Sequence, residues 1–134
     1  MTESSALVLD TSAAAALFLQ EENGRVVEEA LGGVLSGNGQ IFVPSLFWFE
    51  IGNVLLIAFR RKRISRDEIF GIENDLAELP LVTDGTPEAS IRSHIREIAF
   101  DSDLSYYDSA YVELAKRLCL PLLSFDRRVN EAMA

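Results

Sequence analysis

Hydrophobic residues in this chain form short runs that alternate with longer segments in which they recur at helical spacing. The short runs predict buried strands at residues 6–9, 41–43, 81–83 and 121–124. The longer segments predict helices at residues 13–19, 21–35, 44–59, 65–79, 86–100 and 105–118, with a short last helix from residue 126. Such alternation is typical of an α/β protein. We expect one domain, residues 1–134, folded as a three-layer α/β/α sandwich with a mainly parallel central sheet.

The longest apolar segment, residues 44–59, reads PSLFWFEIGNVLLIAF and is hydrophobic on all sides of the helix it predicts. Such a helix is usually buried in a core or in a subunit interface. Pro44 fits the first helical position. Glu50 lies inside the segment, and no Lys or Arg occurs between it and Arg60. Its carboxylate therefore needs a partner from elsewhere in the chain or a metal ion. The segment is too short for a membrane span and carries Glu50 inside it, so it does not predict one.

The composition limits the kinds of site. The chain has a single Cys and a single His, which excludes a zinc site built from several such ligands, so any metal would bind to oxygen atoms. We expect Cys119, among apolar neighbours, to be a buried, inert thiol.

No signal-like segment is evident, which predicts a cytoplasmic protein. The net charge of −9 is unfavourable for binding nucleic acid, although the basic residues are grouped in a run at residues 60–63 and a pair at residues 127–128. The first group is equally explained as a solvated helix end.

Carboxylates occur at the predicted ends of strands and the starts of helices. Asp10 ends the first strand, and Asp126 follows the last strand closely. Ligands of open parallel sheets bind outside the carboxyl ends of the strands. Asp108, in the first turn of its helix, and Glu50, in the second turn of its own, begin near the same edge. Each acid also has a structural explanation. Asp10 and Asp126 can be helix caps. Asp108, three residues after Ser105, can complete a capping box or complement the helix dipole. Glu50 can be a hydrogen-bonded acid at an interface.

Convergence of these acids predicts metal chemistry. Clustered carboxylates raise one another's pKa unless cations neutralise them. Oxygen ligands without His or Cys suit Mg²⁺ or Mn²⁺, and such ions activate water and stabilise the leaving oxygen in phosphodiester hydrolysis. Ser124, and Asn53 on the same helical face as Glu50, are placed to orient the acids.

The segments LVLDTSAAAALF, PSLFWFEIGNVL, LSYYDSAYVELAKRL and LPLLSFDRRV resemble, in this order, the motifs of PIN-domain ribonucleases, especially VapC-type toxins. The resemblance covers residues 6–129. It implies cleavage of RNA with Mg²⁺ or Mn²⁺, a homodimer, and inhibition by a cognate VapB-like antitoxin. It also implies a metal site formed by Asp10, Glu50, Asp108 and Asp126, supported by Thr11, Asn53 and Ser124. Substrate contacts would come from Arg60, Arg61, Lys62, Arg63, Arg66, Arg127 and Arg128. Family members often add a strand after the last motif, where this sequence predicts only a short helix.

Other functions compete with this interpretation. A catalytically silent PIN-like module could bind a partner through residues 44–59. A phosphoacceptor receiver domain has a similar fold class, but it requires an early acidic pair and a late Lys that this chain lacks. A phosphatase of the DxD type requires a second Asp where Ser12 stands. DNA is open as a substrate alongside RNA, and the site can hold one or two metal ions.

Overall fold

A four-stranded parallel sheet forms the centre of the computed structural model, which describes residues 6–134. The strands are β1 (Leu7–Leu9), β2 (Ile41–Pro44), β3 (Leu81–Asp84) and β4 (Leu122–Leu123), in the order β3-β2-β1-β4. Val8 of β1 is in register with Phe42 of β2 and with Leu122 of β4. Because all the strands run in the same direction, their carboxyl ends meet at one edge of the sheet.

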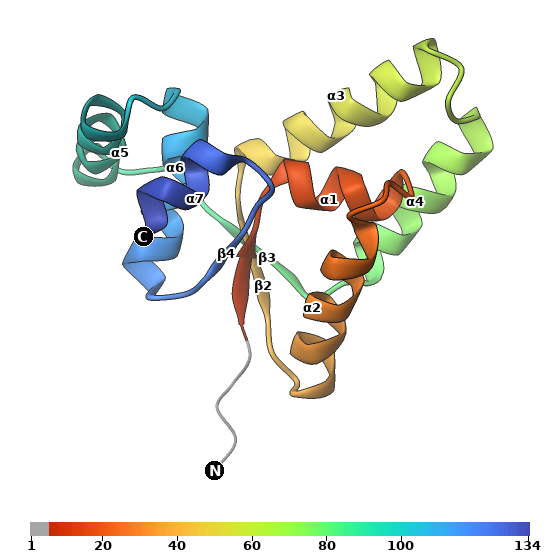
Figure 1. The fold of residues 1–134 in the computed structure, drawn as a ribbon, viewed down its shortest axis with the longest axis horizontal. Coiled ribbons are helices and arrows are strands. Elements are labelled where there is room, and N and C mark those ends of the chain that lie inside the picture. Colours follow the sequence, from red (N-terminus) through yellow and green to blue (C-terminus); the bar gives the residue numbers. More distant parts are fainter. Residues whose placement is uncertain (1–5) are drawn as a thin grey trace.

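Helices cover both faces of the sheet, which confirms the predicted α/β architecture (Figure 1). α1 to α4 lie on one side, and α5 to α7 lie on the other. Their bounds are α1 (Thr11–Phe18), α2 (Gly24–Ser36), α3 (Leu46–Arg60), α4 (Arg66–Glu78), α5 (Ala89–Ser102), α6 (Tyr106–Leu118) and α7 (Arg127–Met133). The buried core joins Val8 and Ile41 of the sheet to Phe47 of α3 and Leu114 of α6. No described helix combines the length and the apolar character needed to cross a membrane.

The apolar helix α3 differs from its prediction in two ways. It begins at Leu46, because Pro44 is the last residue of β2 and pairs in register with Asp84 of β3. Only one face of the helix is buried, through Phe47, Ile51, Leu55 and Ala58. Several apolar side chains on its other faces are exposed: Trp48, Phe49, Leu56 and Ile57. The prediction of a helix buried all round is thus wrong for this chain on its own, because α3 leaves the sheet and forms a projecting arm with α4 (Figure 1).

The carboxyl end of α6 corrects another prediction. Cys119 is exposed rather than buried. It occupies the C-cap with a φ of 56°, in the left-handed region, and its backbone N–H donates to carbonyls at the end of the helix. Apolar neighbours in sequence therefore do not imply burial at this helix end.

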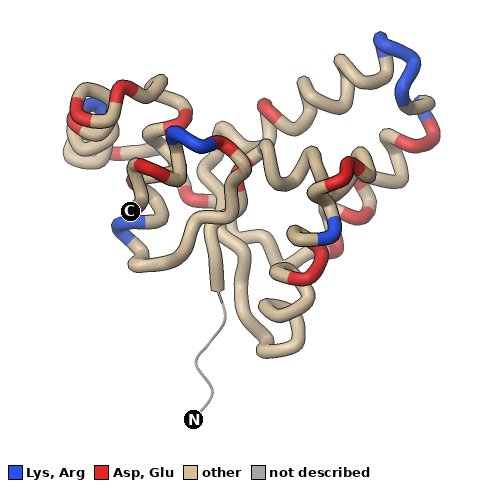
Figure 2. Tube along the Cα trace, in the orientation of Figure 1, with Lys and Arg blue, Asp and Glu red and all other residues tan. Residues whose placement is uncertain are grey.

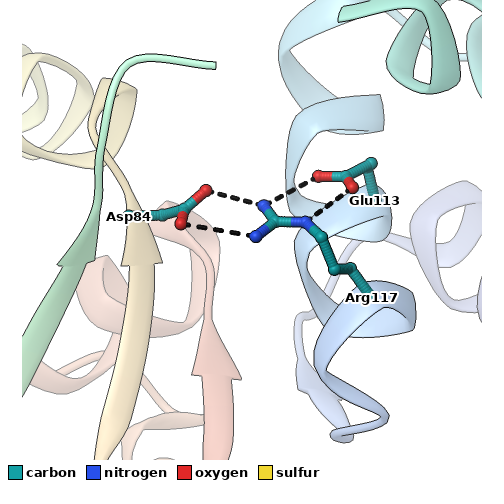
Figure 3. A network of polar contacts seen from close by, with 3 residues as sticks. All are labelled: Asp84, Glu113 and Arg117. Carbon is teal, nitrogen blue, oxygen red and sulfur yellow. Dashed lines mark hydrogen bonds and ion pairs between the residues drawn. The ribbon is translucent and has the colours of Figure 1, made fainter. Parts of the chain in front are cut away.

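An ion-pair network fastens α6 to the end of the outer strand β3 (Figure 3). Arg117 Nε donates to Glu113 Oε2 at 2.8 Å, and Arg117 Nη2 donates to Asp84 Oδ2 at 2.7 Å. The Glu113 side chain is 5 % exposed, whereas that of Arg117 is 31 % exposed. Hydrogen bonds to Glu113 and Asp84 raise the pKa of the Arg117 guanidinium, so it remains charged. Arg117 is therefore the counter-charge of a buried carboxylate.

Replacing Arg117 by Ala should lower the free energy of unfolding by about 2–3 kcal/mol, because it leaves Glu113 buried without its partner. This value is below the range for fully buried pairs, because solvent already reaches Arg117. Urea denaturation followed by circular dichroism measures the change. The matched control is Arg96→Ala, since Arg96 pairs with Glu97 on an exposed surface and should cost less than about 0.5 kcal/mol. Equal losses in the two variants would contradict the structural role of the network.

Candidate active site

The predicted acids lie around the carboxyl ends of the central strands. Asp10 directly follows β1, is 6 % exposed, and its backbone N–H donates to the carbonyl of Leu123 in β4 at 3.2 Å. Asp126 caps the start of α7, and Asp108 lies in the first turn of α6. Figure 2 shows acidic segments around the beginning of α7, at this end of the sheet. The parallel topology thus brings together side chains that are far apart in sequence.

Asp108 is close enough to two of the other acids to sense their charges. Partial burial raises the pKa of the Asp108 carboxyl, and the negative charges of Asp126 and Asp10 raise it further. A hydrogen bond with Ser105 and the positive charge of Arg128 act in the opposite direction but do not cancel the rise. An acid with a raised pKa among other acids is a group whose charge a bound cation would stabilise.

Glu50 of α3 lies at the same edge and forms hydrogen bonds with side chains of α1 and α6. Its Oε1 accepts from Thr11 Oγ1 at 2.9 Å and from the Tyr111 hydroxyl at 2.6 Å. These two hydroxyl oxygens are themselves 2.8 Å apart. Burial, followed by the hydrogen bond to Glu50, raises the pKa of Tyr111, so its hydroxyl stays protonated and donates. Since Thr11 adjoins Asp10 and Tyr111 lies one helical turn after Asp108, this network ties α3 to α1 and α6.

Each of the remaining two acids is held by one carboxylate oxygen. Asp10 Oδ1 accepts from Ala13 N at 3.0 Å and from Ser12 Oγ at 2.7 Å. Asp126 Oδ1 accepts from two backbone N–H groups at the start of α7, at 2.9 and 3.2 Å. In the hydrogen bonds among residues 6–134, the second oxygen of Asp10, Glu50 and Asp126 has no partner. The protein thus orients these carboxylates while leaving an oxygen of each available.

No cation of the described chain occupies the site. The ion pairs among residues 6–134 include none of the four acids. Arg128 instead pairs with Asp103 at 2.7 Å, and Arg127 pairs with Glu131 at 3.5 Å. The helix caps predicted for Asp10 and Asp126 are present, but each uses one oxygen only. Capping therefore explains their position without excluding a second role.

The donor set fits a hard divalent cation. Its ligands are carboxylate oxygens, which suit Mg²⁺ or Mn²⁺. Over the described part of the chain, no three His, Cys, Asp or Glu side chains are grouped closely enough to hold an ion as they stand. Repulsion between like charges favours this spacing. Binding one ion through three or more of these acids would therefore require them to move closer together, whereas one or two carboxylates with water molecules would suffice for Mg²⁺.

Among the residues around the acids, Ser124 was predicted, whereas Ser12 and Tyr111 were missed by the sequence analysis. Ser124 is buried, and its Oγ accepts from the backbone N–H of Asp126 at 3.0 Å. Ser12 donates to Asp10 and accepts from Phe125 N at 3.0 Å, which links α1 to the segment after β4. Tyr111 is the other missed residue. Its position three residues after Asp108 was the only sequence signal that the two share a helical face.

The predicted basic residues fall into two separate places. Arg127 and Arg128 directly follow Asp126, so they border the acidic edge. The run at residues 60–63 forms the turn at the tip of the α3–α4 arm, coloured blue in Figure 2. Along the helix axis, Arg60 is about 15 Å from Glu50. Asn53 is exposed and lines a surface hollow together with Glu50.

Comparison with known proteins identifies the family. A family model described as PIN domain matches residues 7–133, almost the whole chain. The chain belongs to the PIN domain family. This confirms the resemblance inferred from the four sequence segments.

Two proteins of Pyrobaculum aerophilum are similar to this PIN domain. Over 125 residues, the chain is 30% identical to a protein named Ribonuclease VapC3, covering 93% of this chain and 92% of that protein. The crystal structure of PAE2754 superposes with a TM-score of 0.71 at 18% identity, covering 96% of this chain and 80% of the other. The second similarity supports the fold alone.

Proposed function

We propose that this PIN domain is a metal-dependent endoribonuclease that acts as the toxin of a type II toxin–antitoxin system. The family and the similarity to a protein named Ribonuclease VapC3 support nuclease activity on RNA. The observation that carries the proposal is the hydrogen bonding of Glu50 to Thr11 and Tyr111, which brings the acid of α3 to the edge where Asp10 and Asp108 lie. No Lys or Arg among residues 6–134 forms an ion pair with any of the four acids.

In this proposal, Asp10, Glu50, Asp108 and Asp126 hold Mg²⁺ or Mn²⁺ through their carboxylate oxygens. When bound, the ion supplies Lewis acidity and lowers the pKa of a water molecule. Tyr111 and Thr11 fix the orientation of Glu50, and Ser12 does the same for Asp10. Such orienting groups commonly contribute 10- to 100-fold to metal affinity or activity. Arg127 and Arg128, bordering Asp126, are positioned to approach the substrate phosphate.

The partners belong to the same proposal. The exposed apolar residues toward the tip of the arm, Leu56 and Ile57, provide a surface for a second subunit or for a VapB-like antitoxin. Both partners would be met in the cytoplasm. Arg60, Arg61, Lys62 and Arg63 at the tip would contact only an RNA large enough to extend along α3.

The proposal is tested by cleavage of a 5′-labelled single-stranded RNA, with DNA of the same sequence as a parallel substrate. We expect cleavage of RNA that is abolished by EDTA and restored by excess Mg²⁺ or Mn²⁺, because the ligands are oxygen atoms. Cleavage that survives EDTA would contradict metal dependence. The absence of cleavage with either ion would favour a silent interaction module instead.

A further inference from the structure

Two exposed aromatic side chains lie beside the acidic edge. Phe49 is 82 % exposed and Tyr107 is 64 % exposed. Phe49 directly precedes Glu50 on α3, and Tyr107 directly precedes Asp108 on α6. Both line one surface hollow of about 380 Å³, whose other lining residues are Leu46, Glu50 and Asn53. An apolar surface of this kind next to convergent polar groups is typical of a binding site.

The fold does not require these aromatic rings. The core contacts of α3 are made by Phe47 and Ile51, whereas Phe49 projects toward solvent. On α6, the buried residues begin at Ser109, so Tyr107 lies outside the packed face. Neither side chain takes part in a hydrogen bond, an aromatic pair or a cation–π contact among residues 6–134. Both rings are therefore available to a ligand.

The charge of the protein indicates what they bind. With a net charge of −9, the chain repels a polyanion at long range. The two arginines nearest the acidic edge are already paired, Arg127 with Glu131 and Arg128 with Asp103. Phosphate contacts normally supply most of the affinity of a nucleic-acid-binding protein. Both arginine side chains are exposed, at 89 % and 60 %, so they can still reach a phosphate. At this net charge, contacts to the bases would add affinity that the charges do not supply.

We propose that Phe49 and Tyr107 form a base-stacking subsite that holds single-stranded RNA at the acidic edge, an inference that rests on the proposed ribonuclease function. Stacking on aromatic rings accepts any base, because every base has a π-face. A nucleotide stacked here has its phosphate next to the carboxylates that would bind the metal. Bases within a duplex are already stacked on their neighbours, so this subsite selects unpaired RNA.

The composition of the hollow favours a nucleotide over an apolar protein segment. Glu50 and Asn53 form part of its wall. An apolar side chain packed into the hollow would remove the Glu50 carboxylate from water without compensation, which is costly. A nucleotide places an apolar ring face against the aromatic residues, and its sugar hydroxyls and base-edge N–H groups can donate to Glu50 and Asn53. The apolar and polar parts of the ligand thus match the apolar and polar parts of the wall.

Steady-state cleavage of a short single-stranded RNA by Phe49→Ala and Tyr107→Ala tests the subsite. We expect KM to rise about 10-fold or more for each variant, with a smaller change in kcat, because stacking contributes to binding. Phe49→Trp should retain the wild-type KM. Phe49→Leu should behave like Phe49→Ala, because leucine keeps an apolar side chain but has no ring. The matched control is Phe70→Ala, which removes a phenylalanine that is 61 % exposed on α4, outside the hollow, and should leave KM unchanged.

A binding measurement separates this inference from the nuclease proposal. In an Asp108→Asn background that prevents cleavage, fluorescence anisotropy should show tighter binding of single-stranded than of duplex RNA, and Phe49→Ala should remove the difference. Equal KM values for wild type and Phe49→Ala, or full retention by Phe49→Leu, would overturn the stacking subsite while leaving the nuclease intact. A change in self-association of Phe49→Ala with unchanged RNA binding would also overturn it and would indicate a protein interface. If the wild-type protein cleaves no RNA with Mg²⁺ or Mn²⁺, the nuclease proposal itself fails.

Discussion

Asp10→Asn is expected to lower the rate of RNA cleavage by more than about 100-fold, the upper range for residues that only orient a metal ligand. The carboxylate uses Oδ1 to accept from Ala13 N and Ser12 Oγ. Asn keeps an equivalent oxygen and is an equally good N-cap. The substitution therefore preserves the start of α1 and changes the second oxygen, which has no partner among the described residues. Initial rates with saturating Mg²⁺ measure the effect.

The control for this variant is Asp75→Asn, which removes the same charge from an exposed position on α4. It should retain wild-type activity, and circular dichroism should show both variants folded. Activity of Asp10→Asn within about threefold of the control would exclude Asp10 as a metal ligand, since loss of a metal ligand costs far more than loss of a remote charge. In that case Asp10 would be a helix cap only.

The fold was predictable because each local signal in the sequence agrees with the next. The short apolar runs form strands, and the helix expected from residue 65 is present, with Ser65 and Glu68 forming a capping box at its start. The expectation that the acids meet at one edge followed from topology, since parallel strands share one carboxyl edge. These inferences need only the order of residues along the chain and a general rule for parallel sheets.

Contacts between distant segments could not be predicted in the same way. The bond from Tyr111 to Glu50 joins residues that are 61 positions apart, and a buried tyrosine hydroxyl has many possible partners. The composition of α3 suggested burial on all sides, but the faces that become covered depend on how α1 and α4 pack against it. The prediction of a buried Cys119 is wrong because apolar neighbours in sequence do not show which side of a helix end is covered.

The two basic groups illustrate the same limit. In sequence, the run at residues 60–63 contains the cations nearest to Glu50. The intervening helix is rigid and carries them to the tip of the arm, away from the sheet edge (Figure 2). Residues 127–128, which are distant from Glu50 in sequence, come next to the acids because α7 starts at that edge. Residues that are only ten positions apart in sequence, such as Glu50 and Arg60, are thus about 15 Å apart along the helix axis.

Asp108→Asn is expected to stabilise the metal-free protein while removing its stabilisation by Mg²⁺. The pKa of Asp108 is raised above its ordinary value of 3.8, by burial first and by the charge of Asp126 next. Between that value and the raised pKa, the folded state binds more protons than the unfolded state. Stability therefore falls as pH rises through this window, and the loss persists above it. Asn carries no charge, so at neutral pH the variant in EDTA should unfold at a higher temperature than the wild type.

Thermal unfolding followed by circular dichroism at pH 4 to 7, in EDTA and in Mg²⁺, measures both effects. Mg²⁺ at 100 times its dissociation constant should stabilise the wild type by about 2.7 kcal/mol, or roughly 10 °C in Tm. Asp108→Asn should lose most of this increase, because it lacks a ligand for the ion. Asp75→Asn should keep the wild-type response in both buffers. A lower Tm for Asp108→Asn in EDTA would contradict repulsion among the acids. An undiminished response to Mg²⁺ would place the ion elsewhere. The Asp108 carboxylate thus destabilises the metal-free protein and at the same time serves as a ligand for the cation.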